Sequence, residues 1–307
     1  MTIKIKKFQN AKGAISFLEG LALDTNDTIV FRGHPDSMYK LVNTWQRHRS
    51  IPHESWMSDI DEALEKFKVG LEKIGITSHD HLDRFESMEH GRHHGVPTPC
   101  LDFSYSPYVA LFFAFDGVRV NYKNKKKDYS VIYALNINQL ASEWAKQTNP
   151  PKANEDKFHE AYWTFQNPND DFLKNGFPAN KLQFFPYPGK KNQRMQKQLG
   201  ALLYDTLNYE HLKVKGLEEY IEKIKEIPVS ENGKSKPGAP ILYKIFIDQK
   251  CTGDIFKKLE LMNMTGGTLY GDADGVALDI KNAYNYNPKF SYLRDIKSPD
   301  IDDTKTY

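Results

Sequence analysis

The residues best suited to chemistry lie in three short segments that are far apart in the chain. An apolar run ends abruptly in Arg32, Gly33 and His34. Residues 90–110 combine three histidines, an aspartate and a Ser-Pro step with several glycines and prolines. Residues 268–275 read Thr-Leu-Tyr-Gly-Asp-Ala-Asp-Gly. Dense polar and ring chemistry beside Gly and Pro is typical of a pocket rather than a core, so the fold must bring these segments together.

The Arg32-Gly33 step suits the recognition of an anion. Arginine presents a planar fork of N–H donors that can hold a phosphate or a carboxylate at two points. Gly33 lets a ligand approach the backbone closely. The alternative is that Arg32 pairs with a buried carboxylate at the end of its strand.

The histidines of the second segment are His90, His93 and His94, which have helical spacing, and His79 and His81 precede them. The two glycines among them predict that the helix has already ended there. No HExxH pattern or positioned carboxylate accompanies them, so no metal site is expected. We favour a role for these histidines in hydrogen bonding or in lining a ligand site.

Two aspartates are candidates for a pocket carboxylate. Asp102 lies in an apolar run before a capped helix, and it either bonds the amides of the adjoining turn or takes part in a site. In the third segment, Asp272 is suited to a helix N-cap, whereas Asp274 is suited to a pocket. Half of a calcium loop is present there, but its remaining ligands are missing. Residues 192–200 are basic and rich in amides, which fits either a nucleic-acid contact or a solvated helix.

The elements that must position these residues alternate without a regular βαβ order. Short apolar runs with β-branched or aromatic residues predict strands at residues 28–32, 129–135, 181–185, 201–204 and 241–247. Capping residues predict helices after Ser55, Ser78, Ser106 and Thr252. This order predicts an α+β fold with a mixed or antiparallel sheet and surrounding helices. Residues 147–188 show little periodicity and are predicted to form an irregular insertion.

Composition excludes several classes of protein. Hydrophobic residues make up 39% of the 307, which is enough for a packed core. The net charge of +2 means that any nucleic-acid contact must come from a local patch. With only Cys100 and Cys251, neither a disulfide framework nor a cysteine zinc site is expected. No signal peptide or membrane span is visible, so we expect no membrane partner and a reducing cytoplasm as the location.

Together the segments resemble the FRG domain, a family named for an aromatic-Arg-Gly motif. Phe31-Arg32-Gly33 matches that motif. The family signature Gln-His-His-Gly-x-Pro-Thr-Arg-Leu-Leu-Asp-Trp-Thr, followed by Ser-Pro and an Ala-Leu-x-Phe-Ala helix, is matched by residues 93–104 and 106–114. Arg194, Gln198 and Gly200 match an Arg-x3-Gln-x-Gly element, and residues 269–275 match the closing Leu-Phe-Pro-Asp-x-Asp-Gly. Pro99 stands where the family usually has Arg, Cys100 replaces Leu and Gly271 replaces Pro.

The resemblance implies a single FRG domain over residues 1–307, with a core at about 25–285 and a flexible tail at 290–307. A weaker similarity to ADP-ribosyltransferases of the Arg-Ser-Glu type implies a split sheet in which the arginine grips NAD. On that similarity Ser104 falls in their Ser-Thr-Ser strand, and Gln198 lies nearest to their Gln-x-Glu. Because the glutamate is absent, either Asp274 or Asp102 serves as the acid, or the fold no longer catalyses.

These likenesses imply an NAD-dependent ADP-ribosyltransferase-like toxin of bacterial anti-phage defence or of a toxin–antitoxin system. NAD would be its substrate, a protein or nucleic acid its acceptor, and an antitoxin its partner. The resemblance assigns catalysis to Asp274, Asp102 and Gln198, and NAD binding to Arg32, Gly33, His34, His94, Ser104, Tyr105 and Tyr108. The alternatives are a non-enzymatic nucleic-acid-binding or sensor module, with lysines 123–127 and 190–197 contacting phosphates, and, less favoured, a nuclease.

Overall fold

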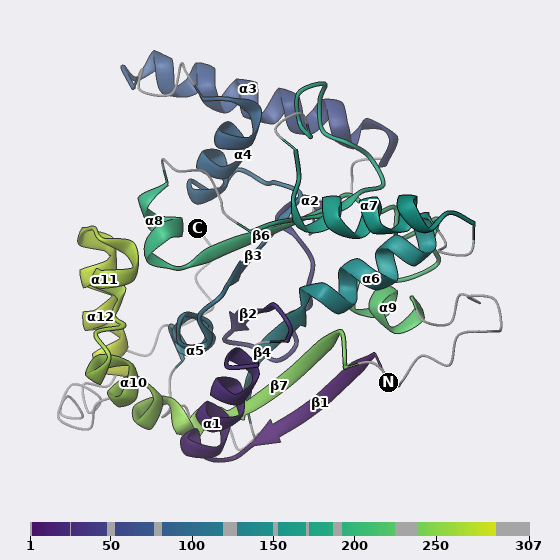
Figure 1. Cartoon of the computed structure of the whole chain (residues 1–307). Helices are drawn as coiled ribbons and strands as arrows, with labels where there is room; N and C mark the ends of the chain where they lie inside the picture. Colours follow the sequence, from purple (N-terminus) through teal and green to yellow (C-terminus); the bar gives the residue numbers. More distant parts are fainter. Residues whose placement is uncertain are drawn as a thin grey trace, which may run out of the picture.

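The computed structural model describes residues 2–24, 26–47, 53–76, 82–118, 128–149, 153–169, 172–186, 192–224 and 239–286. Its centre is a mixed sheet of seven strands in the order β1-β7-β4-β2-β3-β6-β5 (Figure 1). The strands are β1 Ile3–Phe8, β2 Ile29–His34, β3 Cys100–Ser104, β4 Tyr129–Asn136, β5 Leu182–Phe185, β6 Gly200–Asp205 and β7 Leu242–Asp248. Only β1 and β7 run parallel among these neighbours. The prediction of an α+β fold with a mixed sheet is confirmed.

The sheet opens between β2 and β3. Their register consists of the single pair Phe31 and Ser104. By contrast, β2 pairs with β4 over its whole length, and β3 pairs with β6 over its whole length. Backbone groups on the facing edges of β2 and β3 therefore lack the ladder that a continuous sheet would give them, and other donors and acceptors must satisfy them.

Helices cover both faces of this sheet (Figure 1). One core cluster joins the sheet to α1 Ala11–Ala22, α5 Pro107–Phe115 and α10 Thr252–Leu261. A second joins the opposite face to α6 Ile137–Thr148, α7 Glu155–Gln166 and α9 Leu217–Lys223. A third lies beneath α3 Trp56–Lys73 and α4 Arg84–His93. The remaining helices are α2 Thr44–Arg47, η1 His53–Ser55, α8 Gln193–Lys197, η2 Gln249–Cys251, α11 Gly266–Tyr270 and α12 Ala273–Tyr286.

The helix α5 is held directly against β2. The Ser106 hydroxyl accepts a hydrogen bond from the backbone N–H of Val109, and Pro107 takes the first helical position, as the sequence predicts. A Cβ at Gly33 would overlap the carbonyl oxygen of Ala110. Gly33 is therefore required by the close approach of α5, in addition to any approach of a ligand.

The helix predicted after Ser78 differs from the sequence expectation at both ends. It begins at Arg84, where Asp83 and Glu86 form a capping box, and Ser78 itself lies outside the described residues. Of the two glycines expected to mark the end of the helix, Gly91 lies within α4, which continues to His93, whereas Gly95 follows its end with a positive φ. A side chain at Gly91 would press against Leu64 and Val96, so this glycine serves helix packing rather than helix termination.

Other differences concern elements that the sequence did not reveal. The strands β1 and β3 were not predicted. Within residues 147–188 the structure has β5, which the sequence predicts at residues 181–185, and α7, which it does not predict, so the prediction of an irregular insertion is wrong over α7. The predicted tail, the lysines 123–127 and Lys190 fall outside the described residues. Among the residues that the structure does describe, no helix is long and apolar enough to span a membrane.

Candidate functional site: an arginine-lined pocket at the sheet opening

A pocket of about 380 Å³ lies at the opening between β2 and β3. Its walls come from β2, β3, the C-terminal end of α4, α5 and α8. The charged and polar lining residues are Arg32, Arg92, His93, Asp102, Ser104, Asp116, Arg194 and Gln198. Phe31, Phe103 and Phe113 contribute aromatic wall, together with smaller apolar residues. Two of the three segments that the sequence singled out therefore meet here.

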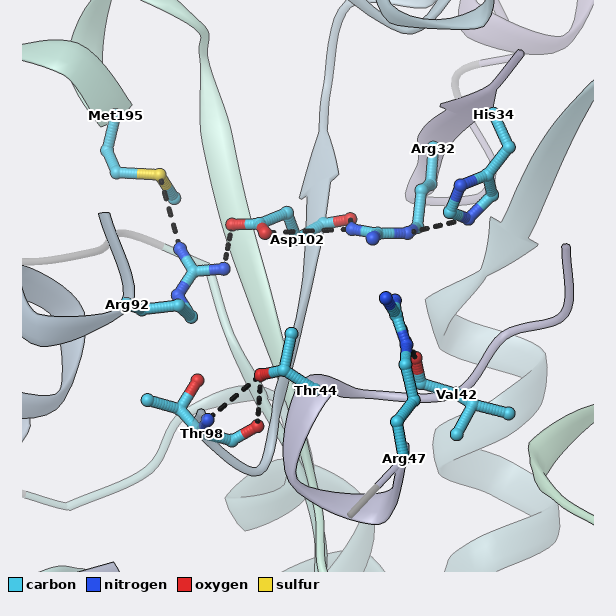
Figure 2. Close-up of polar contacts among 9 residues, drawn as sticks. All are labelled: Arg32, His34, Val42, Thr44, Arg47, Arg92, Thr98, Asp102 and Met195. Atoms are coloured by element: carbon cyan, nitrogen blue, oxygen red, sulfur yellow. Dashed lines mark hydrogen bonds and ion pairs between the residues drawn. The ribbon is translucent and has the colours of Figure 1, made fainter. Parts of the chain in front are cut away.

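Arg32 spans the gap between the two diverging strands. Its Nη1 donates a hydrogen bond of 2.7 Å to the backbone carbonyl of Asp102, and its Nε donates one of 3.1 Å to Nε2 of His34 (Figure 2). The same Nη1 lies 3.6 Å from a carboxylate oxygen of Asp102. The guanidinium thus satisfies a carbonyl that would otherwise lack a partner at the sheet opening. Arg32 therefore lines the pocket and also approaches a carboxylate, but that carboxylate is half exposed rather than buried as the alternative expected.

His34 supports Arg32 as a neutral acceptor. Burial, with Arg32 and Arg47 as nearby positive charges, lowers the pKa of His34 to about 3. The ring therefore accepts the Arg32 hydrogen bond at Nε2 and carries its proton on Nδ1. His34 does not line the pocket, so it acts on Arg32 rather than on a ligand.

Asp102 lies between two guanidinium groups, as Figure 2 shows. Arg92 forms an ion pair with Oδ1, and Arg32 approaches Oδ2. The side chain of Arg92 is only 6% exposed, whereas that of Asp102 is 49% exposed. Burial alone would raise the pKa of Asp102, but Arg92 and Arg32 hold it below its ordinary value. The carboxylate therefore stays negatively charged while part of it faces the pocket.

The opposite wall carries a third guanidinium. Arg194 stacks on the ring of Tyr270 at 4.0 Å from its centroid, which fixes the plane of the guanidinium. Nearby, Asp116 accepts a hydrogen bond of 3.2 Å from Asn282 of α12. Nε of Arg92, Nε of Arg194 and Nε2 of His93 are buried without a hydrogen-bond partner among the described residues. Unsatisfied donors of this kind at a pocket wall favour a ligand that brings oxygen acceptors.

Ser104 and Gln198 line the pocket but are committed to hydrogen bonds within the protein. The Ser104 hydroxyl donates to the carbonyl of Gln198 at 2.7 Å and accepts from the backbone N–H of Ser106 at 2.9 Å. The Gln198 amide donates to the carbonyl of Leu269 at 3.3 Å. These bonds tie β3, α8 and α11 together around the pocket.

Other residues expected at the site lie outside the pocket lining. His94 contacts the rings of Phe67 and His90. Tyr105 packs against a core cluster, and the Tyr108 hydroxyl donates a hydrogen bond of 2.5 Å to Glu19.

The two aspartates of the third segment, Asp272 and Asp274, also lie outside the pocket lining. Asp272 accepts a hydrogen bond from the backbone N–H of Gly275 and caps α12, as one interpretation expected. Asp274 is exposed in the first turn of α12 and is not part of the pocket wall.

Several lining residues were not expected at the site from the sequence: Arg92, His93, Phe113 and Asp116. Arg194 matches a sequence motif, but that match assigned it no place in the site. Arg92 is the most informative of them. Pro99 stands where the family signature usually has an arginine, and Arg92, seven residues earlier, brings a guanidinium to Asp102. Among the described residues, no three His, Cys, Asp or Glu side chains are grouped as metal ligands.

Comparison with known families gives one match, to part of the chain. The model of the FRG domain family matches residues 27–123, a segment that contains Arg32, Arg92, His93 and Asp102. Comparisons with curated proteins and with solved structures gave no match. The chain is thus an α+β protein with an FRG-like segment and an arginine-lined pocket at the opening of its sheet. Arg194 and Gln198 are added to the pocket from beyond that segment.

Proposed function

We propose that this pocket binds a small ligand that carries phosphate. The observation that carries the proposal is that three guanidinium groups line the pocket. Two of them, those of Arg92 and Arg194, have a buried N–H without a partner among the described residues. Arginine forks match phosphate oxygens in geometry and charge. The volume of about 380 Å³ falls within the range of small-molecule sites, so a nucleotide-sized ligand suits it better than a polymer.

We further propose that the ligand is NAD and that the protein cleaves its nicotinamide–ribose bond. In that reaction the bond between the ribose carbon and the ring nitrogen breaks and nicotinamide leaves with the electron pair. An acceptor oxygen or nitrogen, such as that of water, then bonds to the ribose carbon and releases its proton to solvent. Positive charge develops on the ribose as the bond breaks. An ionised carboxylate such as Asp102 stabilises that charge, and the arginines hold the diphosphate.

Consumption of NAD inside a cell would make the protein a toxin, as the resemblance to defence proteins implies. Transfer of ADP-ribose to a protein or a nucleic acid would have the same result. Expression of the chain would then arrest growth, and an antitoxin partner would be needed to prevent it. Arg32→Ala would relieve the arrest, because it removes the arginine at the sheet opening.

A second candidate function is a binding module without turnover. The specific observation in its favour is that both carboxylate oxygens of Asp102 already face arginines. A carboxylate held in this way can serve as the structural counter-ion of a sensor site. The same ligand would then bind without being consumed.

The test is release of nicotinamide by the purified chain incubated with NAD. We expect release by the wild type and by Asp274→Asn, which serves as a matched loss of an aspartate outside the pocket. We expect loss of release in Asp102→Asn. Binding of NAD without any release by the wild type would reject the enzyme and support the binding module, and absence of binding would reject both.

A further inference from the structure

His93 is a pocket residue with one ring nitrogen, Nε2, that has no hydrogen-bond partner among the described residues. It lies at the C-terminal end of α4, next to Arg92, and its ring lines the pocket. Its Nε2 is buried and has no hydrogen-bond partner among the residues described by the structure. A buried ring nitrogen without a partner is unfavourable in the free protein, so its position calls for a group supplied from outside.

The charges that surround His93 are mostly positive. Arg92 precedes it on α4, Arg194 faces it from α8, and His90 lies one turn earlier on its own helix. Asp102 on β3 is the opposing negative charge. Burial, together with Arg92, lowers the pKa of His93 to about 4. The imidazole is therefore neutral in the free protein at ordinary pH.

An anionic ligand changes this balance. Its negative charge offsets Arg92 and Arg194, which are the two cations that oppose protonation of the ring. Its oxygens also provide the acceptor that an Nε2–H donor lacks in the free protein. Both changes favour the protonated imidazole, and a charged donor bonds an anionic oxygen more strongly than a neutral one.

We propose that His93 is a ligand-binding residue whose Nε2 hydrogen-bonds an anionic oxygen of the ligand, and that it takes up a proton as the ligand binds. This inference rests on the phosphate-binding pocket proposed above. It also defines the ligand class further, because only a ligand that brings negative charge next to α4 would be bound more tightly as pH falls. The adjacent His94, whose ring contacts Phe67 and His90 outside the pocket, should have no such effect.

The probe is ADP-ribose, whose diphosphate keeps its negative charge across the neutral range and does not itself take up a proton there. Calorimetric titration at pH 6 in two buffers of different ionisation enthalpy measures proton uptake directly. For the wild type we expect uptake on binding, with affinity falling by up to about tenfold per pH unit as pH rises from the pKa of the free ring towards that of the complex. This measurement needs no variant, so it remains valid if a variant fails to fold.

Two substitutions test whether His93 is the residue that takes up the proton when ADP-ribose binds. In His93→Gln the side-chain amide can still donate from a similar position but cannot titrate, so binding should persist with an affinity that no longer depends on pH. His94→Gln should bind with the pH dependence of the wild type. ADP-ribose binding without proton uptake, or unchanged uptake in folded His93→Gln, would overturn the role of His93 and leave the pocket proposal intact. Absence of ADP-ribose binding to the wild type would overturn both.

Discussion

Replacing Asp102 with asparagine separates the structural role of this residue from its chemical role. The substitution keeps the shape of the side chain and one carbonyl acceptor for Arg92, but it removes the negative charge between two guanidinium groups. Arg92 and Arg32, which are 6% and 17% exposed, would then face each other without a counter-ion. Loss of one partner of a fully buried ion pair costs about 3–5 kcal/mol.

The expected cost here is smaller, because the Asp102 side chain is half exposed and solvent screens its interactions. We expect a loss of about 2 kcal/mol in the free energy of unfolding at pH 7. For a chain of this size that corresponds to a decrease in melting temperature of roughly 3 °C. The pKa of Asp102 is lowered in the folded state, so its stabilisation is present above the ordinary carboxyl pKa and is lost as pH falls through the folded value. The difference between wild type and variant should therefore shrink in acid.

The substitution should lower turnover without weakening the binding of ADP-ribose. The pocket is lined by three arginines and two aspartates, so the substitution raises its net positive charge by one. ADP-ribose should bind at least as tightly, whereas nicotinamide release should fall by on the order of 10²-fold or more. Denaturant unfolding, calorimetry and nicotinamide release on the same preparation measure all three quantities. An Asp102→Asn protein with the stability and turnover of the wild type would refute the reasoning.

Four further predictions concern other residues. Arg32→Ala should abolish nicotinamide release and also lower stability by about 1–3 kcal/mol, since the carbonyl of Asp102 loses its donor, and unchanged release from a folded variant would contradict this. Asp274→Asn should leave turnover unchanged, because the side chain is exposed on α12, and a large loss of turnover at unchanged melting temperature would restore it as the catalytic acid. Burial raises the pKa of Asp205 from 3.8 to about 6, so the free energy of unfolding should fall as pH rises from 4 through 6 in the wild type but not in Asp205→Asn. Cys100 and Cys251 are buried free thiols, and both should react with a thiol reagent only after unfolding.

The sequence predicted those strands and helices whose hydrophobic pattern or capping residues match their burial and their ends in the structure. The buried strand β4 is mostly apolar and aromatic, β7 is apolar and aromatic except at Lys244 and its last residue Asp248, and α5 begins at a Ser-Pro cap. The strand β1 was missed because it is an edge strand in which exposed lysines interrupt the apolar pattern. The strand β3 was missed because Asp102 sits within it, at a sheet opening that no local pattern encodes.

Residues of the candidate site could be predicted only where a short sequence motif contains them. Arg32 and Asp102 stand out within short motifs, and the structure brings them together. Arg92 and Arg194 could not be assigned in this way, because their contacts join the end of α4 and α8 to strands and helices distant in sequence. The resemblance assigned NAD binding to His94, whereas His93 is the histidine that lines the pocket, since one residue of helical rotation decides which ring faces it.

The most direct test of the central claim is a crystal structure of the chain with ADP-ribose. The pocket proposal predicts that the diphosphate lies between Arg92 and Arg194, with its oxygens accepting hydrogen bonds from the two Nε–H groups that lack partners among the described residues. The ribose should lie beside Asp102. A complex in which ADP-ribose binds elsewhere, with the pocket at the β2–β3 opening unchanged, would contradict the account.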